Sequence, residues 1–504
     1  MAALCLVLLA PLTVADVPPL LDYPNHLARL FVLAADGSDP VLARFFQPRW
    51  AVIPNLALDL TVPPAIAWLG VHTAGRLAIG IVLLLPVAGA VAYHRVLSGR
   101  WSYWPFAAVL FVYNGALLRG FLNFSAATGL ALLFAAAWAV WRERWPLLAI
   151  AIGALGGAIL FFCHLMGLLF FVLLIAGHEL AWLWRAKGQF SPQILGARLA
   201  LNCQVLALPA MLYMRSELGQ MPGEPVFRSL PEKLNAALFP VVEYCWALDV
   251  ATAVLCVAAA GLCLARRWCA VPLAAGAALG ALGLLFLAAP HAFKGTFDLD
   301  ARFIVMAAAL APAALIPVRV PRRVAALLFV GFLVLFGARM GVVLTVWSRW
   351  AGDLAAFREV IAFVPEGAIA MTVRTPMTPG PSPKTWLADA RTLSDGTATD
   401  THLPALLTIE RRAWWPFLFD NPSQQPIAVP PPYNLLAERT DAMSDPIGWL
   451  VGGAPDAALY THLLVLGEIS GPALSGLLSG PRKLTRVAGN GTASLFAVAP
   501  LATR

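Results

Sequence analysis

Long apolar runs recur through the first 346 residues, separated by short stretches that contain charged residues, Gly or Pro. A membrane-spanning α-helix needs roughly 20 mainly apolar residues, and most of these runs approach that length. Eleven such helices are predicted, at residues 2–15, 65–93, 103–118, 121–141, 146–161, 164–184, 198–214, 242–264, 269–289, 302–317 and 324–346. The first and fifth are short for a full span. The pattern therefore predicts a mainly α fold, a polytopic transmembrane helical bundle.

The first apolar run has a second interpretation. Thr13-Val14-Ala15 fits the cleavage site of a secretory signal peptide, but no Lys or Arg precedes the run, as a signal peptide normally requires. We therefore expect a retained helix and eleven spans. Cleavage would leave ten spans and the same topology.

The residues after the last predicted span differ in character. Segment 347–504 is polar and rich in Pro, and it alternates strand-like stretches with helix-like ones. Strands are predicted at 367–373, 458–468 and 493–499, and helices at 353–364 and 402–414. We therefore divide the chain into a transmembrane bundle, 1–346, which includes a long polar loop at 16–64, and a small mixed α/β domain, 347–504.

Composition and charge support this topology. Hydrophobic residues make up 60% of the chain and charged residues 12%, about half the charged fraction of a soluble domain. Alternate short loops carry basic residues, which the positive-inside rule places in the cytoplasm: Arg95, Arg100, Arg142, Arg144, Arg185, Lys187, Arg198, Arg266, Arg267, Arg319, Arg322 and Arg323. The N-terminus is then cytoplasmic, whereas loop 16–64 and the C-terminal domain are extracytoplasmic. The net charge of +8 reflects topology and indicates no nucleic-acid partner.

The stretch LLDYPNHLARLFVL, residues 20–33, lies just beyond the first span. Pro24 suits the first turn of a helix, so a helix is predicted from about residue 24 to 35. Asp22, His26 and Arg29 would share one face and apolar residues the other, which is typical of an amphipathic helix on the membrane surface. In the simplest alternative, Asp22 only caps this helix and His26 is a surface residue.

Other polar residues lie near the same membrane face. Asp59 stands at the entry to the second span, and a carboxylate beside lipid is costly unless something pairs with it or uses it. His164, Arg119, Lys294, Asp300 and Arg302 lie at other outward turns. Each alone is explained by helix capping or by snorkelling to the interface. Together they favour a shared outward cavity.

This layout resembles the GT-C superfamily of integral-membrane glycosyltransferases, which use sugars carried on polyprenyl phosphate. The resemblance covers the first span, a long outward loop with an early acidic residue, a helical bundle and an extracytoplasmic C-terminal domain. The chain is also similar to uncharacterised bacterial membrane proteins with segments like DYPNHLAR, PNLALDL and CHLMG. It departs from several superfamily members in lacking an Asp-Glu or Glu-x-Asp pair, because Tyr23 follows Asp22.

The resemblance implies transfer of a sugar from a polyprenyl-phosphate donor to an acceptor hydroxyl on a lipid, glycan or protein, at the outer face of a bacterial plasma membrane. Asp22 would be the general base, His26 its partner, and Asp59 a positioning group. Arg302, Lys294 and Arg119 would bind the phosphate, with His164 and Asp300 also at the substrate. No cofactor is required, although Mg²⁺ or Mn²⁺ would suit oxygen ligands from Asp22 and Asp59.

The C-terminal domain would recognise the acceptor or the sugar. Trp414, Trp415 and Tyr433 are candidates for stacking on sugar rings, unless they form its core. His402, Glu410 and Asp420 are candidates for hydrogen bonds.

Two other functional classes stay open. A transporter or lipid flippase would place charges deep within its spans, and Arg76, Glu179, Asp249 and Arg339 are the residues to inspect. A noncatalytic envelope assembly protein would use the outer domain to bind a partner and would tolerate loss of Asp22.

Overall fold

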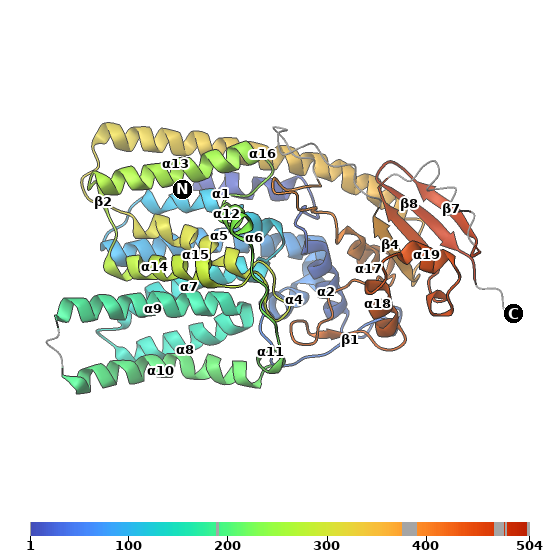
Figure 1. Cartoon of the computed structure of the whole chain (residues 1–504), viewed down its shortest axis with the longest axis horizontal. Coiled ribbons are helices and arrows are strands. Elements are labelled where there is room, and N and C mark those ends of the chain that lie inside the picture. The colour runs from blue at the N-terminus through green and yellow to red at the C-terminus, as the bar shows by residue number, and fades with distance from the viewer. Residues whose placement is uncertain (1, 188–190, 375–390, 468–477, 479–480, 501–504) are drawn as a thin grey trace.

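The computed structural model describes residues 2–187, 191–374, 391–467, 478 and 481–500. Helices fill one end of the molecule, and a small β-sheet lies at the other end (Figure 1). In the described part of the chain, seven helices are long and apolar enough to cross a bilayer: α5 (Val71–Ser98), α7 (Leu122–Trp141), α8 (Pro146–Cys163), α9 (Leu165–Ala186), α10 (Pro192–Arg215), α13 (Trp246–Ala265) and α16 (Arg322–Ile361). The prediction of a mainly helical fold with apolar, membrane-type helices is confirmed.

The other four predicted runs are helical but shorter than 18 residues. They form α1 (Ala2–Leu9) with 3₁₀-helix η1 (Ala10–Thr13), η3 (Trp104–Phe111) with α6 (Gly115–Leu118), α14 (Leu273–Ala288) and α15 (Leu299–Ala314). The run 103–118 is interrupted because Asn114 caps a separate short helix, its Oδ1 accepting from the amides of Ala116 and Leu117 at 2.9 and 3.0 Å. Length and apolarity thus support seven spans, fewer than the number predicted.

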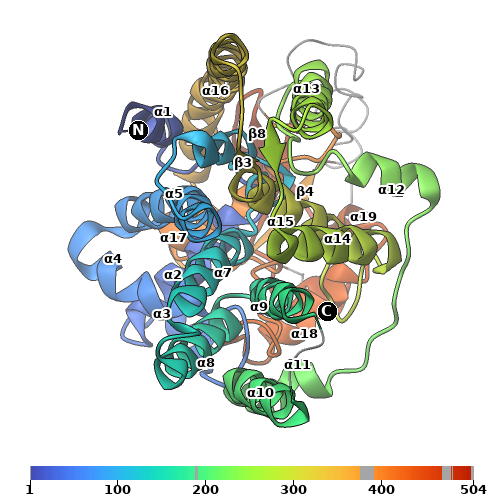
Figure 2. The same ribbon diagram turned by 90° about the vertical axis from the view of Figure 1, so that its left-hand side faces the viewer.

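Small residues let the central helices approach closely. A Cβ atom added at Gly129 of α7 would lie 2.3 Å from the Leu85 backbone carbon of α5. Close backbone contact of this kind replaces the hydrophobic effect as the packing force between helices in lipid. Short elements connect the bundle: η2 (Leu42–Arg44), α3 (Ala57–Thr61), α4 (Pro63–Leu69), α11 (Glu217–Gln220), α12 (Leu230–Ala236), and the paired strands β2 (Cys269–Ala270) and β3 (Ile316–Pro317). Viewed from the bundle end, α12 and α13 lie at its periphery (Figure 2).

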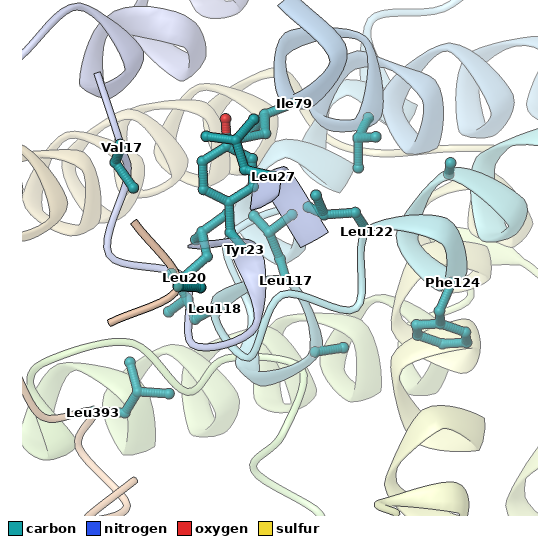
Figure 3. Close-up of a cluster of buried hydrophobic side chains, with 14 of the residues drawn as sticks. Val17, Leu20, Tyr23, Leu27, Ile79, Leu117, Leu118, Leu122, Phe124 and Leu393 are labelled. Carbon is teal, nitrogen blue, oxygen red and sulfur yellow. The ribbon is translucent and has the colours of Figure 1, made fainter. Parts of the chain in front are cut away.

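Helix α2 (Tyr23–Ala35) carries most of the polar motif and lies between the bundle and the C-terminal region (Figure 1). Its apolar side packs into a buried cluster in which Tyr23 and Leu27 lie beside Leu117 (Figure 3). The polar side is covered as well, because Asn25 and Arg29 are 0% and 1% exposed. The predicted helix is therefore present, but the prediction that its polar face is exposed is wrong.

The C-terminal region is continuous with the bundle through α16, a helix of 40 residues that runs from one to the other (Figure 1). The predicted span 324–346 and the predicted helix 353–364 are both parts of α16, so the boundary placed at 346 cuts a single helix. The sheet has the order β4 (Ala370–Arg374), β6 (His462–Leu466), β8 (Ala493–Val498), β7 (Leu484–Gly489), with β4 and β6 parallel and the other pairs antiparallel. Strands β4, β6 and β8 confirm the three predicted strands. The edge strand β7, which is mostly exposed, was not predicted.

Short helices accompany the sheet: η4 (Leu403–Ala405), α17 (Leu406–Arg411), α18 (Tyr433–Asp441), α19 (Pro446–Val451) and η5 (Pro455–Ala457). This region is fastened to the polar loop that precedes the second span. Strand β1 (Gln47–Pro48) pairs with β5 (Ile427–Ala428), and the Trp350 indole donates to the Val17 carbonyl at 2.7 Å. Asn25 donates to the Phe417 carbonyl at 2.7 Å and accepts from the Phe419 amide at 2.9 Å. Helix α2, called the motif helix below, thereby holds segment 416–421 in place.

Candidate functional site

A cavity of about 1080 Å³ lies where the bundle meets the C-terminal region. Five of the eight predicted site residues line it: Asp22, His26, His164, Lys294 and Arg302. They come from α2, the turn between α8 and α9, loop 290–298 and the start of α15. The opposite wall comes from the C-terminal region, chiefly His402 and segment 416–425. Residues that are far apart in sequence are thus brought together around one space.

The other three predicted site residues do not line the cavity, because each is held in ion pairs. Asp59 accepts from Arg29 at 2.7 and 3.2 Å, and both side chains are almost fully buried. Asp300, also buried, lies 2.9 Å from Lys233 Nζ and 3.3 Å from Arg228 Nε. Arg119 pairs with Asp298 at 3.3 Å and Asp395 at 2.7 Å. Their geometry is that of structural ion pairs.

Asp22 stands at the N-cap position of α2, but its side chain makes no cap hydrogen bond. Its Oδ1 lies instead 3.0 Å from Nδ1 of His402. The Asp22 carboxylate therefore does not cap the helix, and the simplest alternative for this residue is wrong. The backbone of Asp22 is held by the neighbouring turn, since its amide donates to the Arg119 carbonyl at 3.1 Å.

Gly120 makes this close approach to Asp22 possible. Its φ is +86°, and an added Cβ would lie 2.8 Å from the Asp22 amide nitrogen and 2.9 Å from its Cβ. We expect Gly120→Ala to lower the free energy of unfolding by about 1–3 kcal/mol more than Gly396→Ala, because it adds overpacking to backbone strain. Gly396 is the matched control, with φ of +89° and no neighbour within 4 Å. Thermal unfolding of the purified variants measures the difference, and equal losses would contradict the tight contact.

His26 is not the partner of the Asp22 carboxylate. Its Nδ1 lies 3.1 Å from Nη1 of Arg29, and its ring packs edge-on against Phe419 at 5.6 Å. Burial and the Arg29 guanidinium hold the pKa of His26 well below its usual value, so the ring is neutral at pH 7. The residue that meets Asp22 is His402, which lies 380 positions later in the chain.

Arg302 is a buried cation that lines the cavity and is 5% exposed. Its guanidinium carbon lies 4.2 Å from the ring centre of Phe121 and 5.3 Å from that of Phe124. Nη2 donates to the Phe297 carbonyl at 3.1 Å, whereas Nε is buried with no hydrogen-bond partner. Among the described residues, no carboxylate lies within 4.0 Å of this guanidinium. A buried cation with this environment is suited to an anion supplied from outside the protein.

His164 adds a second donor at the same point. Its Nδ1 accepts from the Met166 amide at 3.1 Å, so in the neutral ring Nε2 carries the proton. Burial, with Arg302 nearby, holds the pKa of His164 well below its usual value and keeps the ring neutral. Nε2 lies 2.8 Å from Nη1 of Arg302, a contact in which the role of Nε2 depends on the tautomer. In the tautomer that the Met166 contact favours, Nε2 and Nη1 are both donors, and an oxyanion that entered between them would accept from both.

Lys294 contributes a further cation to the cavity wall. Its Nζ donates to the carbonyls of Leu218 and Gly219 at 3.1 and 3.3 Å, which tethers the ammonium group in place. The C-terminal wall is of the opposite character, with carboxylates and amides: Asp420, Asn421, Gln424, Gln425, Asn434, Glu438 and Asp441. Burial and the nearby Glu438 raise the pKa of Asp420. The cavity is thus lined by cations from the bundle and by acidic and amide side chains from the C-terminal region.

The aromatic residues predicted to stack on sugars lie elsewhere. Trp414 and Trp415 are 1% and 2% exposed and belong to the core, and Tyr433 packs against Phe45 with ring centres 4.9 Å apart. Glu410 is paired with Arg358 at 2.7 Å. Phe417 and Phe419 line the cavity instead. No feature of the local sequence distinguishes these phenylalanines from the neighbouring tryptophans.

The carboxylates proposed as Mg²⁺ or Mn²⁺ ligands do not come together, because Asp59 is occupied by Arg29. In the part of the chain that the structure describes, no group of three or more His, Cys, Asp or Glu side chains has the arrangement of a metal site. No step of the chemistry considered below is therefore assigned to a metal.

Comparison of this chain with family models, with curated proteins and with solved structures found no match.

Proposed function

We propose that this protein is a membrane glycosyltransferase that moves a sugar from a polyprenyl-phosphate donor to an acceptor hydroxyl. The observation that carries the proposal is Arg302, a buried cation that lines the same cavity as Asp22 and that, among the described residues, has no carboxylate within 4.0 Å. A transferase of this kind needs both elements, a cationic site for the departing phosphate and a basic group for the incoming hydroxyl.

The proposed reaction assigns each group a task. The acceptor oxygen attacks the anomeric carbon of the sugar as its proton passes to the pair formed by Asp22 and His402. The bond between that carbon and the phosphate oxygen breaks, and polyprenyl phosphate leaves with the electron pair. Arg302, His164 and Lys294 stabilise the charge that develops on the phosphate. Because the leaving group is already a stable anion, no general acid is needed.

The acidic wall of the cavity supports a hydroxyl-rich acceptor. Gln425 Oε1 and Asn434 Oδ1 are both buried without a hydrogen-bond partner. Unpaired amide oxygens and carboxylates are acceptors for sugar hydroxyl groups, which would remove the cost of leaving them unpaired.

The distribution of charge supports an extracytoplasmic position for the cavity. Strand β2, which follows Arg266 and Arg267, lies at the end of the bundle opposite the sheet (Figure 1). The positive-inside rule assigns that end to the cytoplasm, so we propose that the sheet and the cavity face outward. The donor would then be used on the outer side of the membrane.

Three of the four charged residues to inspect for a transporter, Glu179, Asp249 and Arg339, are engaged in ion pairs, whereas the fourth, Arg76 near the start of α5, has none among the described residues. Glu179 is bound by Arg142 and Arg198 at 2.9 and 2.7 Å. Arg339 is bound by Glu243 at 2.6 Å and Asp249 at 3.4 Å. These pairs have the character of structural networks, which favours the enzyme over a flippase.

A turnover assay tests the proposal. The full-length protein is reconstituted in lipid vesicles with a panel of polyprenyl-phosphate-linked hexoses and pentoses and with bacterial envelope extracts as acceptors. We expect release of polyprenyl phosphate, measured by mass spectrometry, that exceeds the release in protein-free vesicles. Movement of an intact donor across the vesicle membrane, with no release, would instead identify a flippase. If polyprenyl phosphate is not released and the donor does not move, the protein has a noncatalytic role.

A further inference from the structure

We propose that His402 takes the proton from the hydroxyl group of the sugar acceptor, and that Asp22 positions the His402 ring. This proposal rests on the proposed function and goes beyond it, because the residue that performs the proton transfer would come from the C-terminal region and not from the motif helix.

The Asp22 carboxylate lies beside one nitrogen of the His402 imidazole. Asp22 Oδ1 is 3.0 Å from Nδ1, which is ion-pair distance, and this buried nitrogen has no hydrogen-bond partner of good geometry. A carboxylate opposite a ring nitrogen favours the tautomer in which that nitrogen carries the proton. The lone pair of the neutral ring is then on Nε2.

The other ring nitrogen is free to react. Among the described residues, Nε2 of His402 has no hydrogen-bond partner, and it does not belong to the buried unsatisfied atoms. His402 lines the cavity, so this lone pair is accessible from the space that Asp22, Lys294 and Arg302 also line. A hydroxyl bound there would meet an imidazole base oriented by a carboxylate, the arrangement used by many enzymes that deprotonate alcohols.

Packing holds the imidazole ring in this position. The ring lies edge-on to Phe419, with ring centres 5.0 Å apart, and 6.1 Å from that of Trp415. Phe419 is in turn fixed through its amide by Asn25 of the motif helix, at 2.9 Å. The motif DYPNH thus supplies Asp22 to orient the base and Asn25 to hold the wall against which the base packs.

The proton balance is complete without another reactant. The acceptor O–H bond breaks, its proton goes to Nε2, and the oxygen forms the new bond to the anomeric carbon. The bond to the phosphate oxygen breaks, and its electrons leave on polyprenyl phosphate. Asp22 stays ionised and stabilises the imidazolium that forms. That proton is returned to solvent when the product leaves.

The first test reads the tautomer and needs no substrate. Nitrogen-15 spectra of protein labelled at histidine distinguish the two tautomers, and the signal that disappears in His402→Gln belongs to His402. At a pH where the ring is neutral, we expect the proton on Nδ1 in the wild type and on Nε2 in Asp22→Ala. A wild-type ring protonated on Nε2 would overturn the proposal.

The second test uses release of polyprenyl phosphate from the donor active in the turnover assay. We expect His402→Ala to lower kcat by about 100-fold or more with little change in KM for the donor, and added imidazole to restore part of the rate. The matched control is His462→Ala, a histidine of β6 that does not line the cavity, and it should retain full activity.

The two failures are distinguishable. If His402→Ala keeps near wild-type turnover while Asp22→Asn is inactive, Asp22 itself is the base and the further inference is wrong, but the proposed function stands. If the wild type releases no polyprenyl phosphate from any donor, the proposed function is wrong and the role of His402 as proton acceptor fails with it. The tautomer measurement would then report only on the contact with Asp22.

Discussion

Replacing Arg302 with glutamine is expected to weaken binding of a prenyl phosphate by about 10-fold to 100-fold, because a hydrogen bond to a charged group contributes about 1.5–3 kcal/mol. Arg302→Lys should lie between the wild type and Arg302→Gln. Lysine keeps the charge but loses the planar fork and the stacking between Phe121 and Phe124. Calorimetric titration with farnesyl phosphate, a short and tractable probe, measures the change.

Two controls isolate the phosphate contact. Farnesol has the same apolar chain without the phosphate, so its affinity should be the same for the wild type and Arg302→Gln. Arg439→Gln removes an exposed guanidinium that pairs with Asp456 and does not line the cavity, and it should leave farnesyl phosphate binding unchanged. Equal farnesyl phosphate affinities for the wild type and Arg302→Gln would exclude Arg302 from the anion site.

Breaking the buried pair of Arg29 and Asp59 is expected to cost about 3–5 kcal/mol of unfolding free energy, because the remaining partner becomes an uncompensated buried charge. Arg29→Met and Asp59→Leu should each show this loss. The double variant should recover much of it, since neither charge then remains in the interior. Thermal unfolding in detergent measures all three variants. A catalytic Asp59 would behave differently, with turnover lost at unchanged stability.

An exposed ion pair provides the control for that comparison. Arg49 and Glu217 lie 2.5 Å apart, but their side chains are 43% and 40% exposed. Arg49→Met should therefore cost no more than about 1 kcal/mol. Similar losses at the exposed and the buried pair would contradict the role assigned to burial.

The helices were the predictable part of the fold. Continuous apolar length is a local property of the sequence, and helices such as α7 and α13 lie where the runs predicted them. The environment of α2 was not predictable in the same way. Its polar face suggested a solvated surface, but Asn25 bonds to residues about 390 positions later, a contact that no local pattern encodes. The length of α16 was missed because its apolar half and its amphipathic half have different patterns.

The candidate site was predictable as a location more than as a set of roles. Asp22, His164 and Arg302 stand near the ends of predicted spans, and the predicted topology alone brings those ends to one face. The sequence could not separate these residues from Asp59, Asp300 and Arg119, because the difference lies in which ones find a partner of opposite charge. His402 was considered only as a hydrogen-bonding residue of the outer domain. Its contact with Asp22 depends on how the C-terminal region seats on the bundle.

The proposed function requires that a lipid phosphate binds between Arg302 and His164, in the cavity that Asp22 and His402 line. The most direct test is an experimental structure of the protein in a lipid nanodisc with polyprenyl phosphate bound. We predict phosphate oxygens within hydrogen-bond distance of the Arg302 guanidinium and of His164 Nε2, with the pair of side chains moved apart to admit them. A phosphate bound outside this cavity, with Arg302 and His164 still in contact, would contradict the claim.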